Sequence, residues 1–137
     1  MSQVKSMLYP LIHFYDALGG RFADLSRPQL RLMMKLTGDP PTISELAESL
    51  NISSPGVTQM IDKLQSKGYV ERQSQEKDQR LVRVKVTQGG RGALNLALAS
   101  FEERVEEVLR PLSRDEKDQL LALFLKIEKR MSDPSER

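Results

Sequence analysis

The sequence of 137 residues predicts a single, mainly helical domain that carries one small β-hairpin. Apolar residues recur at helical spacing along most of the chain, whereas in the run over residues 81–87 Val82, Val84 and Val86 alternate with polar residues. The length matches one domain of ordinary size, and 39% hydrophobic and 29% charged residues are compatible with a packed core. We therefore expect one domain over residues 1–137.

The composition excludes several classes of chemistry. The chain has no cysteine, which excludes disulfides, thiolate metal sites and cysteine nucleophiles, and its single histidine, His13, cannot form a His-based catalytic pair. The longest apolar run, residues 120–125, is too short to cross a bilayer, and the N-terminus has no apolar stretch after a basic region. We expect a cytoplasmic protein that is not an enzyme and has no catalytic residues, no metal and no cofactor.

Positive charge is concentrated in the middle of the chain. Residues 53–101 contain eight basic and four acidic residues, although the formal net charge of the whole chain is only +2. Residues 1–52 contain five of each kind, and residues 102–137 contain eight basic and ten acidic residues. Such a local excess is typical of a segment that meets a polyanion.

Four helices are predicted before the hairpin. The first covers residues 4–18 and stops at Gly19-Gly20, and Pro10 is expected to kink it or to move its start later. Each of the next three begins at a capping residue. They are a helix from Ser26 and Pro28 through Leu36, one from Thr42 and Glu45 to about Leu50, and one capped by Ser54 over residues 55–67.

The hairpin is predicted from two β-prone runs, residues 70–73 and 81–87, joined by a polar tip at residues 74–80. Two short helices with a tight turn, followed by a hairpin, form a winged helix-turn-helix, whose second helix enters the major groove of DNA. Ala47 lies where a close helix approach needs a small side chain, Asn51 where the turn needs a left-handed residue, and Val57 where the small core closes. This DNA-binding lobe is expected to span residues 26–91.

Two helices follow the hairpin, one capped by Thr87 and running to Pro111, the other capped by Ser113 and running to Met131. The apolar arc of the last helix is wider than one packing partner needs, which implies a second partner surface. We expect residues 1–20 and 92–131 of two chains to form a homodimer core. Its expected contact residues are Leu8, Leu11, Leu120, Leu121, Phe124 and Leu125.

The predicted helix over residues 55–67 has one apolar face, which we assign to the core, and one polar and basic face. The polar face is either simply solvated or binds DNA, where hydroxyls and amides meet base edges, Lys63 meets a phosphate and Gly56 lets the duplex approach. Arg72, Arg83 and Lys85 on the hairpin either serve phosphates or only keep the ribbon soluble. The candidate DNA-binding residues of the helix are Ser53, Ser54, Gly56, Thr58, Gln59 and Lys63.

Five motifs occur in order between residues 42 and 92. They are ISELA at 43–47, VTQMIDKL at 57–64, KGYVER at 67–72, DQR at 78–80 and VTQGGR at 86–91. Together they resemble the MarR-type transcriptional regulators. The resemblance implies helical dimerisation from both chain ends, a winged helix-turn-helix on a palindromic operator, and in many members release by a small ligand. Arg80 resembles the family's minor-groove arginine, which Asp78 would orient.

The leading hypothesis is therefore a homodimeric, sequence-specific DNA-binding regulator that acts as a repressor on double-stranded DNA. The alternatives are a winged-helix module that docks protein through the helix over residues 55–67, and an enzyme, for which no nucleophile, base or metal cluster is visible. An effector, if one exists, is expected to be small, largely apolar and anionic, bound between the dimer core and the DNA-binding lobe. Tyr9, Tyr15, Met33 and Met34 either line such a pocket or fill a core.

Overall fold

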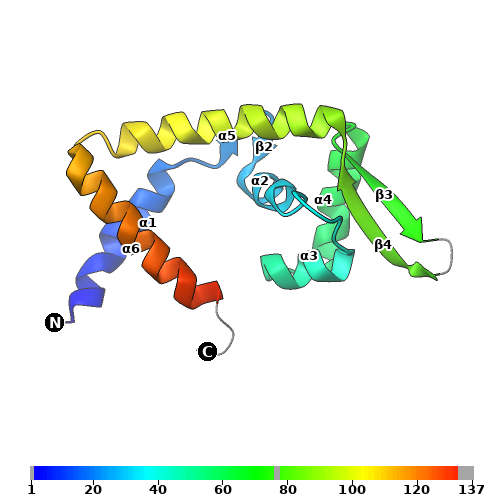
Figure 1. Cartoon of the computed structure of the whole chain (residues 1–137), viewed down its shortest axis with the longest axis horizontal. Helices are drawn as coiled ribbons and strands as arrows, with labels where there is room; N and C mark the ends of the chain where they lie inside the picture. Colours follow the sequence, from blue (N-terminus) through cyan, green and yellow to red (C-terminus); the bar gives the residue numbers. More distant parts are fainter. Residues whose placement is uncertain (1, 76–77, 133–137) are drawn as a thin grey trace.

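The computed structural model describes residues 2–75 and 78–132 and shows a small winged lobe joined by one long helix to a pair of splayed helices (Figure 1). The long helix, α5, lies along one side of the molecule, with the winged lobe at one end and α1 and α6 at the other (Figure 1). In chain order the elements are α1 (Gln3–Ala17), β1 (Arg21–Phe22), β2 (Leu25–Ser26), α2 (Arg27–Met34), α3 (Ile43–Leu50), α4 (Ser54–Ser66), β3 (Val70–Gln75), β4 (Asp78–Val86), α5 (Gln88–Val108) and α6 (Arg114–Ser132).

Local capping starts most of these helices where the sequence predicts. The Ser26 hydroxyl accepts from the Gln29 amide at 3.3 Å while the Gln29 side chain accepts from the Ser26 amide at 2.9 Å, a complete capping box. Thr42 caps α3 and Thr87 caps α5 through hydroxyls that accept backbone amides at 3.1 and 3.0 Å. Ser113 and Glu116 form a second complete box at the start of α6. Four of the five predicted caps are confirmed.

One expected helix cap is wrong, and of the two alternatives for Pro10 the later helix start does not occur, while the kink stays a prediction. The α1 helix begins at Gln3, where the Ser2 hydroxyl caps the Lys5 amide, and it continues through Pro10 rather than starting later. Proline removes only one backbone donor, and this helix is exposed, so water can satisfy the carbonyl left without it. The cap of α4 is Ser53, whose hydroxyl accepts from the Gly56 amide at 3.1 Å, while Ser54 is already helical.

The structure contains more strand than the sequence predicts. The wing pairs β3 with β4 in antiparallel register from Val70↔Val86 to Gln75↔Asp78, with an irregularity after Ser74, so the predicted long polar tip at residues 74–80 is wrong. A second, unpredicted hairpin pairs β1 with β2. Its strands have two residues each, which is too short for an alternating pattern to show in the sequence.

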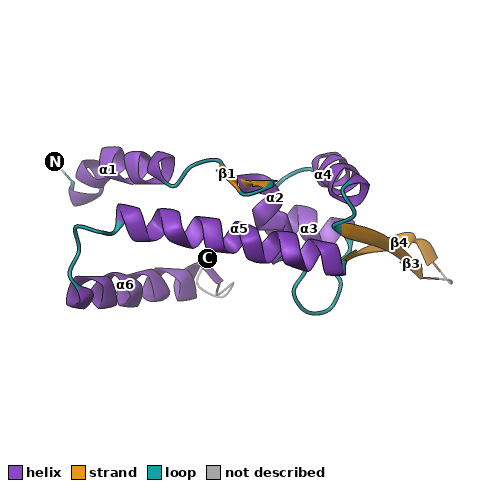
Figure 2. Cartoon of the chain, turned by 90° about the horizontal axis from the view of Figure 1, so that it is seen from above, coloured by secondary structure: helices purple, strands orange, loops and turns teal. Residues whose placement is uncertain are grey.

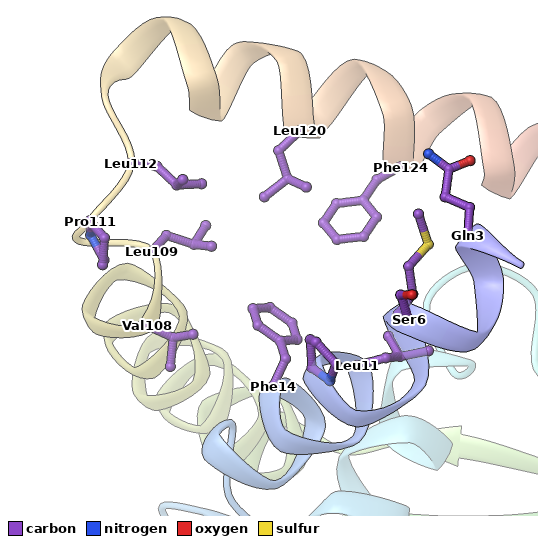
Figure 3. Close-up of a pocket in the computed structure, with 12 residues that line it drawn as sticks. Gln3, Ser6, Leu11, Phe14, Val108, Leu109, Pro111, Leu112, Leu120 and Phe124 are labelled. Atoms are coloured by element: carbon purple, nitrogen blue, oxygen red, sulfur yellow. The ribbon is translucent and has the colours of Figure 1, made fainter. Parts of the chain in front are cut away.

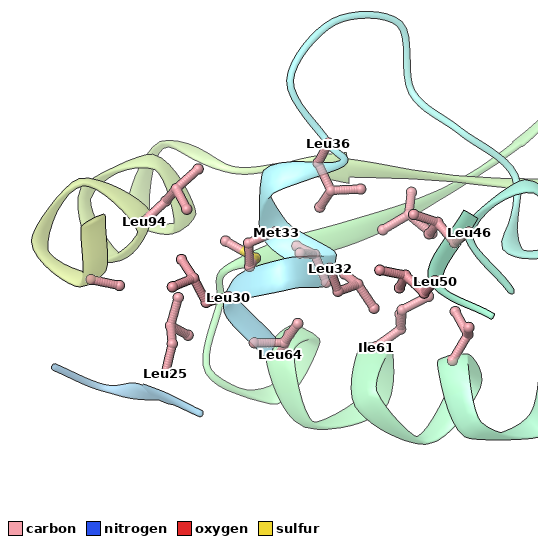
Figure 4. Close-up of a cluster of buried hydrophobic side chains, with 14 of the residues drawn as sticks. Leu25, Leu30, Leu32, Met33, Leu36, Leu46, Leu50, Ile61, Leu64 and Leu94 are labelled. Atoms are coloured by element: carbon pink, nitrogen blue, oxygen red, sulfur yellow. The ribbon is translucent and has the colours of Figure 1, made fainter. Parts of the chain in front are cut away.

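The hydrophobic core lies inside the winged lobe. Figure 4 shows Leu30, Leu32 and Met33 of α2 between Leu94 of α5 on one side and α3 and α4 on the other. Phe22 of β1 adds an edge-to-face ring contact with Phe101 of α5 at 4.9 Å between centroids. The core therefore fixes the lobe on α5 between Leu94 and Phe101.

The helix-turn-helix geometry agrees with the sequence. Asn51 ends α3 in the left-handed region, with φ +56° and ψ +46°. The Ile52 amide then bonds the Ala47 carbonyl at 3.1 Å, and both Ala47 and Val57 are buried. The turn sets α4 against α3 with its apolar face inward.

Candidate nucleic-acid interface

The α4 helix presents two chemically different faces. Val57, Ile61 and Leu64 are fully buried in the lobe core, which is the side that the sequence predicts. The candidate DNA-binding residues lie at the N-terminal end and on the other side: Ser53, Ser54, Gln59 and Lys63 are exposed, and Gly56 and Thr58 are half-buried. Hydroxyl, amide and ammonium groups thus share one accessible helix face, which suits hydrogen bonding to base edges and phosphates.

The N-terminal turn of α4 has a small residue, Gly56, and free backbone amides. A Cβ at Gly56 would lie 3.1 Å from the Ser53 hydroxyl oxygen, so a side chain there would crowd the cap. Pro55 occupies the first turn, where its missing amide costs no helical bond. The free amides and the positive end of the helix dipole therefore point out of this end, as an anion requires.

Two wing arginines are held by contacts that sequence reasoning missed. Arg72 Nη2 lies 2.6 Å from Asp62 Oδ1, and Arg72 Nη1 donates to the Gln65 side chain, so β3 is tied to α4. Arg83 Nη1 donates to the Pro40 carbonyl at 2.9 Å and lies 4.0 Å from Glu45 Oε1. Both guanidinium groups are partly covered, and their role toward phosphates stays a prediction.

Asp78 and Arg80 belong to β4, near the tip of the wing. Their side chains lie outside the part of the structure that is described, so the expected aiming of Arg80 by Asp78 stays a prediction. The backbone pairing of Asp78 with Gln75 places both residues at the end of the hairpin that is farthest along the strands from Val70 and Val86.

A cluster that the sequence does not reveal anchors the other end of α4. Tyr69 Oη donates to Asp24 Oδ2 at 2.6 Å, and Lys67 Nζ lies 3.3 Å from the same oxygen. The hydrogen bond from Tyr69, and then the one from Lys67, lower the pKa of Asp24, whereas the bond to Asp24 raises the pKa of Tyr69. Because Asp24 lies far away in sequence, only the fold brings these groups together.

The helices expected to dimerise are unpartnered within one chain. Neither α1 nor α6 buries a residue, and Phe124, Leu125 and Leu121 are 50%, 54% and 57% exposed. Figure 3 shows Leu120 and Phe124 of α6 facing Phe14 and Leu11 of α1 across an apolar cleft of about 690 Å³. Leu8 and Leu11 are also exposed. From the second viewpoint α1 and α6 lie on opposite sides of α5 (Figure 2).

Of the other residues considered as ligand or pocket residues, only Met33 is buried. His13 is exposed and lies beside the Tyr9 ring at 5.8 Å between centroids. Met33 is buried in the lobe core, whereas Tyr9, Tyr15 and Met34 are exposed. Over residues 2–75 and 78–132 no group of three His, Asp or Glu side chains could hold a metal ion. No helix in those same ranges has both the length and the apolar character needed to span a membrane.

Comparison with known proteins agrees with this geometry. The sequence model described as "MarR family" matches residues 25–82. The chain is 28% identical over 130 residues to YdgJ of Bacillus subtilis (strain 168), an uncharacterized HTH-type transcriptional regulator, a match that covers 92% of this chain and 79% of YdgJ. Wild-type MarR from E. coli in its apo form has a TM-score of 0.76 at 23% identity, covering 93% and 97% of the two chains. The transcriptional regulator BldR from Sulfolobus solfataricus has a TM-score of 0.66 at 28% identity, covering 93% and 89%.

Proposed function

Since this chain belongs to the MarR family of winged helix-turn-helix transcriptional regulators, which are DNA-binding proteins and not enzymes, we propose that it is a repressor that binds a palindromic operator as a homodimer. A protein that occupies its site excludes other proteins from that DNA, so repression needs only a DNA-binding surface and a dimer contact. Both are supported by features of the described residues.

The exposed face of α4 is the observation that carries the proposal. It offers Ser53, Ser54, Thr58, Gln59 and Lys63 and no large apolar side chain. A face that docks protein is expected to show apolar or aromatic anchors at its centre, whereas a face that reads DNA shows amides, hydroxyls and cations. The polar and basic character therefore favours DNA over the protein-docking alternative.

Within this proposal the side chains divide by role. Thr58 and Gln59 meet base edges in the major groove, and Ser53, Ser54 and Lys63 meet bases or phosphates around them. Gly56 lets the duplex approach the start of α4 closely. The wing would add phosphate contacts through Arg72 and Arg83 and a minor-groove contact through Arg80 and Asp78.

Homodimerisation is supported by the apolar surface of α1 and α6. Leu8, Leu11, Leu121, Phe124 and Leu125 are all at least half exposed in a single chain. Exposed apolar surface of this extent marks a surface that another chain covers. A two-fold axis through these helices would present two α4 helices to half-sites about one helical turn apart.

A small, largely apolar anion is the proposed effector class. A cavity of about 380 Å³ lies between α1 and α2, lined by residues that include Tyr15, Gly19, Arg27 and Arg31. Arg27 lies 3.8 Å above the Tyr15 ring and donates to the Gly19 carbonyl. Together with Arg31 it gives the lining two cations against one carboxylate, Asp16, which favours an anionic group. The cavity joins a helix of the proposed dimer core to the lobe, so an occupant there would bias their spacing.

Binding of duplex DNA at rising salt tests the proposal. Duplexes selected from a random pool should bind with an affinity that falls on the order of a thousandfold between 50 and 200 mM salt, because several phosphate contacts release counterions. Affinity that does not change with salt would contradict phosphate contacts. Failure to select any duplex would favour the protein-docking alternative.

A further inference from the structure

The sequence of α4 contains one acidic residue, Asp62. It follows Thr58 by four residues, so it lies one helical turn from a residue proposed to read bases and on the same side of the helix. Its side chain is 62% exposed. Phosphates repel a carboxylate, so Asp62 costs DNA affinity unless it makes a contact that compensates for its charge.

The contact that Asp62 makes is a link to the wing. Its Oδ1 atom accepts from Arg72 Nη2 at 2.6 Å, and Gln65, on the next turn of α4, accepts from Arg72 Nη1. Within residues 2–75 and 78–132, Asp62 bonds to no side chain other than Arg72. A carboxylate and a guanidinium at this distance form a charge-assisted, directional bond. Two acceptors on one side of α4 therefore hold one side chain of β3.

The link lies at the level of the hairpin where the wing also contacts the start of α3. Arg72 pairs with Val84 in the strand register, and the Val84 amide donates to the Pro41 carbonyl at 2.9 Å. Pro41 precedes Thr42, the cap of α3. At one register position the wing is therefore held by a backbone bond on the α3 side and by Arg72 on the α4 side.

Attachment on both sides fixes the direction of the wing. Bonds on one side alone let a two-stranded ribbon rock about them, whereas bonds on two sides do not. The ribbon extends about 10 Å from Arg72 to Gln75 near the tip, because a strand rises about 3.3 Å per residue. Rocking by about 15° would move the tip by about 3 Å, which is the length of a hydrogen bond. A contact from the tip to DNA would not tolerate such a movement.

We infer that Asp62 is a positioning residue for DNA recognition, which acts through Arg72 to hold the wing at a fixed angle to α4. The inference rests on the proposed function and adds to it a residue that touches no DNA itself. A guanidinium has more N–H donors than these bonds use, so Arg72 can bond Asp62 and Gln65 and still meet a phosphate. Both side chains of the ion pair keep contact with solvent, so the pair contributes little to the stability of the fold. Its effect is expected in DNA affinity.

Two other roles for Asp62 predict different results. If the ion pair only occupies the surface, loss of the carboxylate removes a repulsion and leaves DNA affinity unchanged or raises it. If the carboxylate reads a base, it accepts a hydrogen bond from cytosine N4, and its loss relaxes the preference at that base pair. Positioning predicts weaker binding, and only while Arg72 is present.

Fluorescence anisotropy of a duplex selected by the full chain, titrated at several salt concentrations, separates these roles. Asp62→Ala should lose about tenfold in affinity, although it removes a negative charge. The salt slope should fall by about one ion, because Arg72 leaves its phosphate. A partly unfolded sample changes the apparent affinity and not this slope, so the slope distinguishes lost positioning from lost fold. In the Arg72→Gln background, Asp62→Ala should cause no further loss.

Glu48→Ala is the matched control, because it removes from α3 an exposed carboxylate that has no ion pair among the described residues. It should bind like the parent or slightly tighter. The inference is overturned if Asp62→Ala binds like Glu48→Ala, if its loss is as large without Arg72 as with it, or if it relaxes one base pair of the selected site. These results leave the proposed function intact, since the parent still binds the duplex. A parent that selects no duplex refutes the proposed function, and the inference with it.

Discussion

Tyr69 donates a 2.6 Å hydrogen bond to Asp24, a residue 45 positions earlier in the chain. Lys67 adds an ion pair to the same carboxylate and a hydrogen bond of 3.2 Å to the Asp24 carbonyl. Asp24 lies between β1 and β2, and β1 contacts α5 through Phe22 and Phe101. The C-terminal end of α4 is therefore held by a hairpin that is itself packed on the long helix.

The first prediction concerns the acid stability of this contact. The hydrogen bonds from Tyr69 and Lys67 hold the pKa of Asp24 in the folded chain below the ordinary value of an aspartate. The stabilisation is therefore complete above that ordinary value and is lost as the pH falls through the folded pKa. Asp24→Asn should lower the free energy of unfolding in urea at neutral pH, and the gap to the parent should close as the pH falls through the lowered pKa of Asp24. Asp39→Asn is the control, because Asp39 is an exposed carboxyl without such a partner. A gap of constant size down to the acid end would refute the linkage.

The second prediction compares two glycines of α5. A Cβ at Gly90 would lie 2.0 Å from the Tyr69 carbonyl oxygen, whereas one at Gly92 would meet nothing within 4 Å. Gly90→Ala should therefore cost about 1–3 kcal/mol of stability through overpacking against backbone. Gly92→Ala should add about 0.5–1 kcal/mol, because alanine favours the helix. Urea unfolding of both variants checks this, and equal effects would mean that α5 does not pack on Tyr69 as described.

Sequence reasoning succeeds where the signal is local. The hydroxyls at Ser26, Thr42, Thr87 and Ser113 cap helices through bonds to residues three positions away, so a pattern of a few letters is enough. The left-handed Asn51 is also a local requirement of the turn. The helix-turn-helix could therefore be predicted almost residue by residue.

The same reasoning fails where tertiary contacts decide. Ser53 and Ser54 both precede Pro55, and either could cap the helix. In the structure the N-cap is Ser53. Arg83 lies on strand β4 and its partner Glu45 on helix α3, and nothing in the local sequence marks the pair. Such features need the fold itself.

The third prediction tests which of two neighbouring serines caps α4. Ser53→Ala should cost about 1 kcal/mol of stability, because the Gly56 amide loses its acceptor. Ser54→Ala should change stability by less than about 0.5 kcal/mol. Thermal unfolding of the two variants measures the difference. Equal costs would place the cap on both residues or on neither.

The fourth prediction concerns the homodimer. Leu121→Glu/Leu125→Glu should shift sedimentation toward the monomer, because charges would then occupy the exposed apolar face of α6. Leu81→Glu places a charge on an exposed leucine of the wing and should leave association unchanged. A parent chain that stays folded and monomeric at micromolar concentration would defeat the dimer proposal.

The most direct test of the account is selection of bound duplexes from a random pool by the parent and by Gln59→Ala. The parent should enrich a two-fold-related site with half-sites about one helical turn apart. Gln59→Ala should relax the preference at one or two base pairs in each half-site and cost on the order of 1–3 kcal/mol on the parent's site, because Gln59 lies on the exposed face of α4. The same enriched sequence and the same affinity from both proteins would contradict base reading by α4.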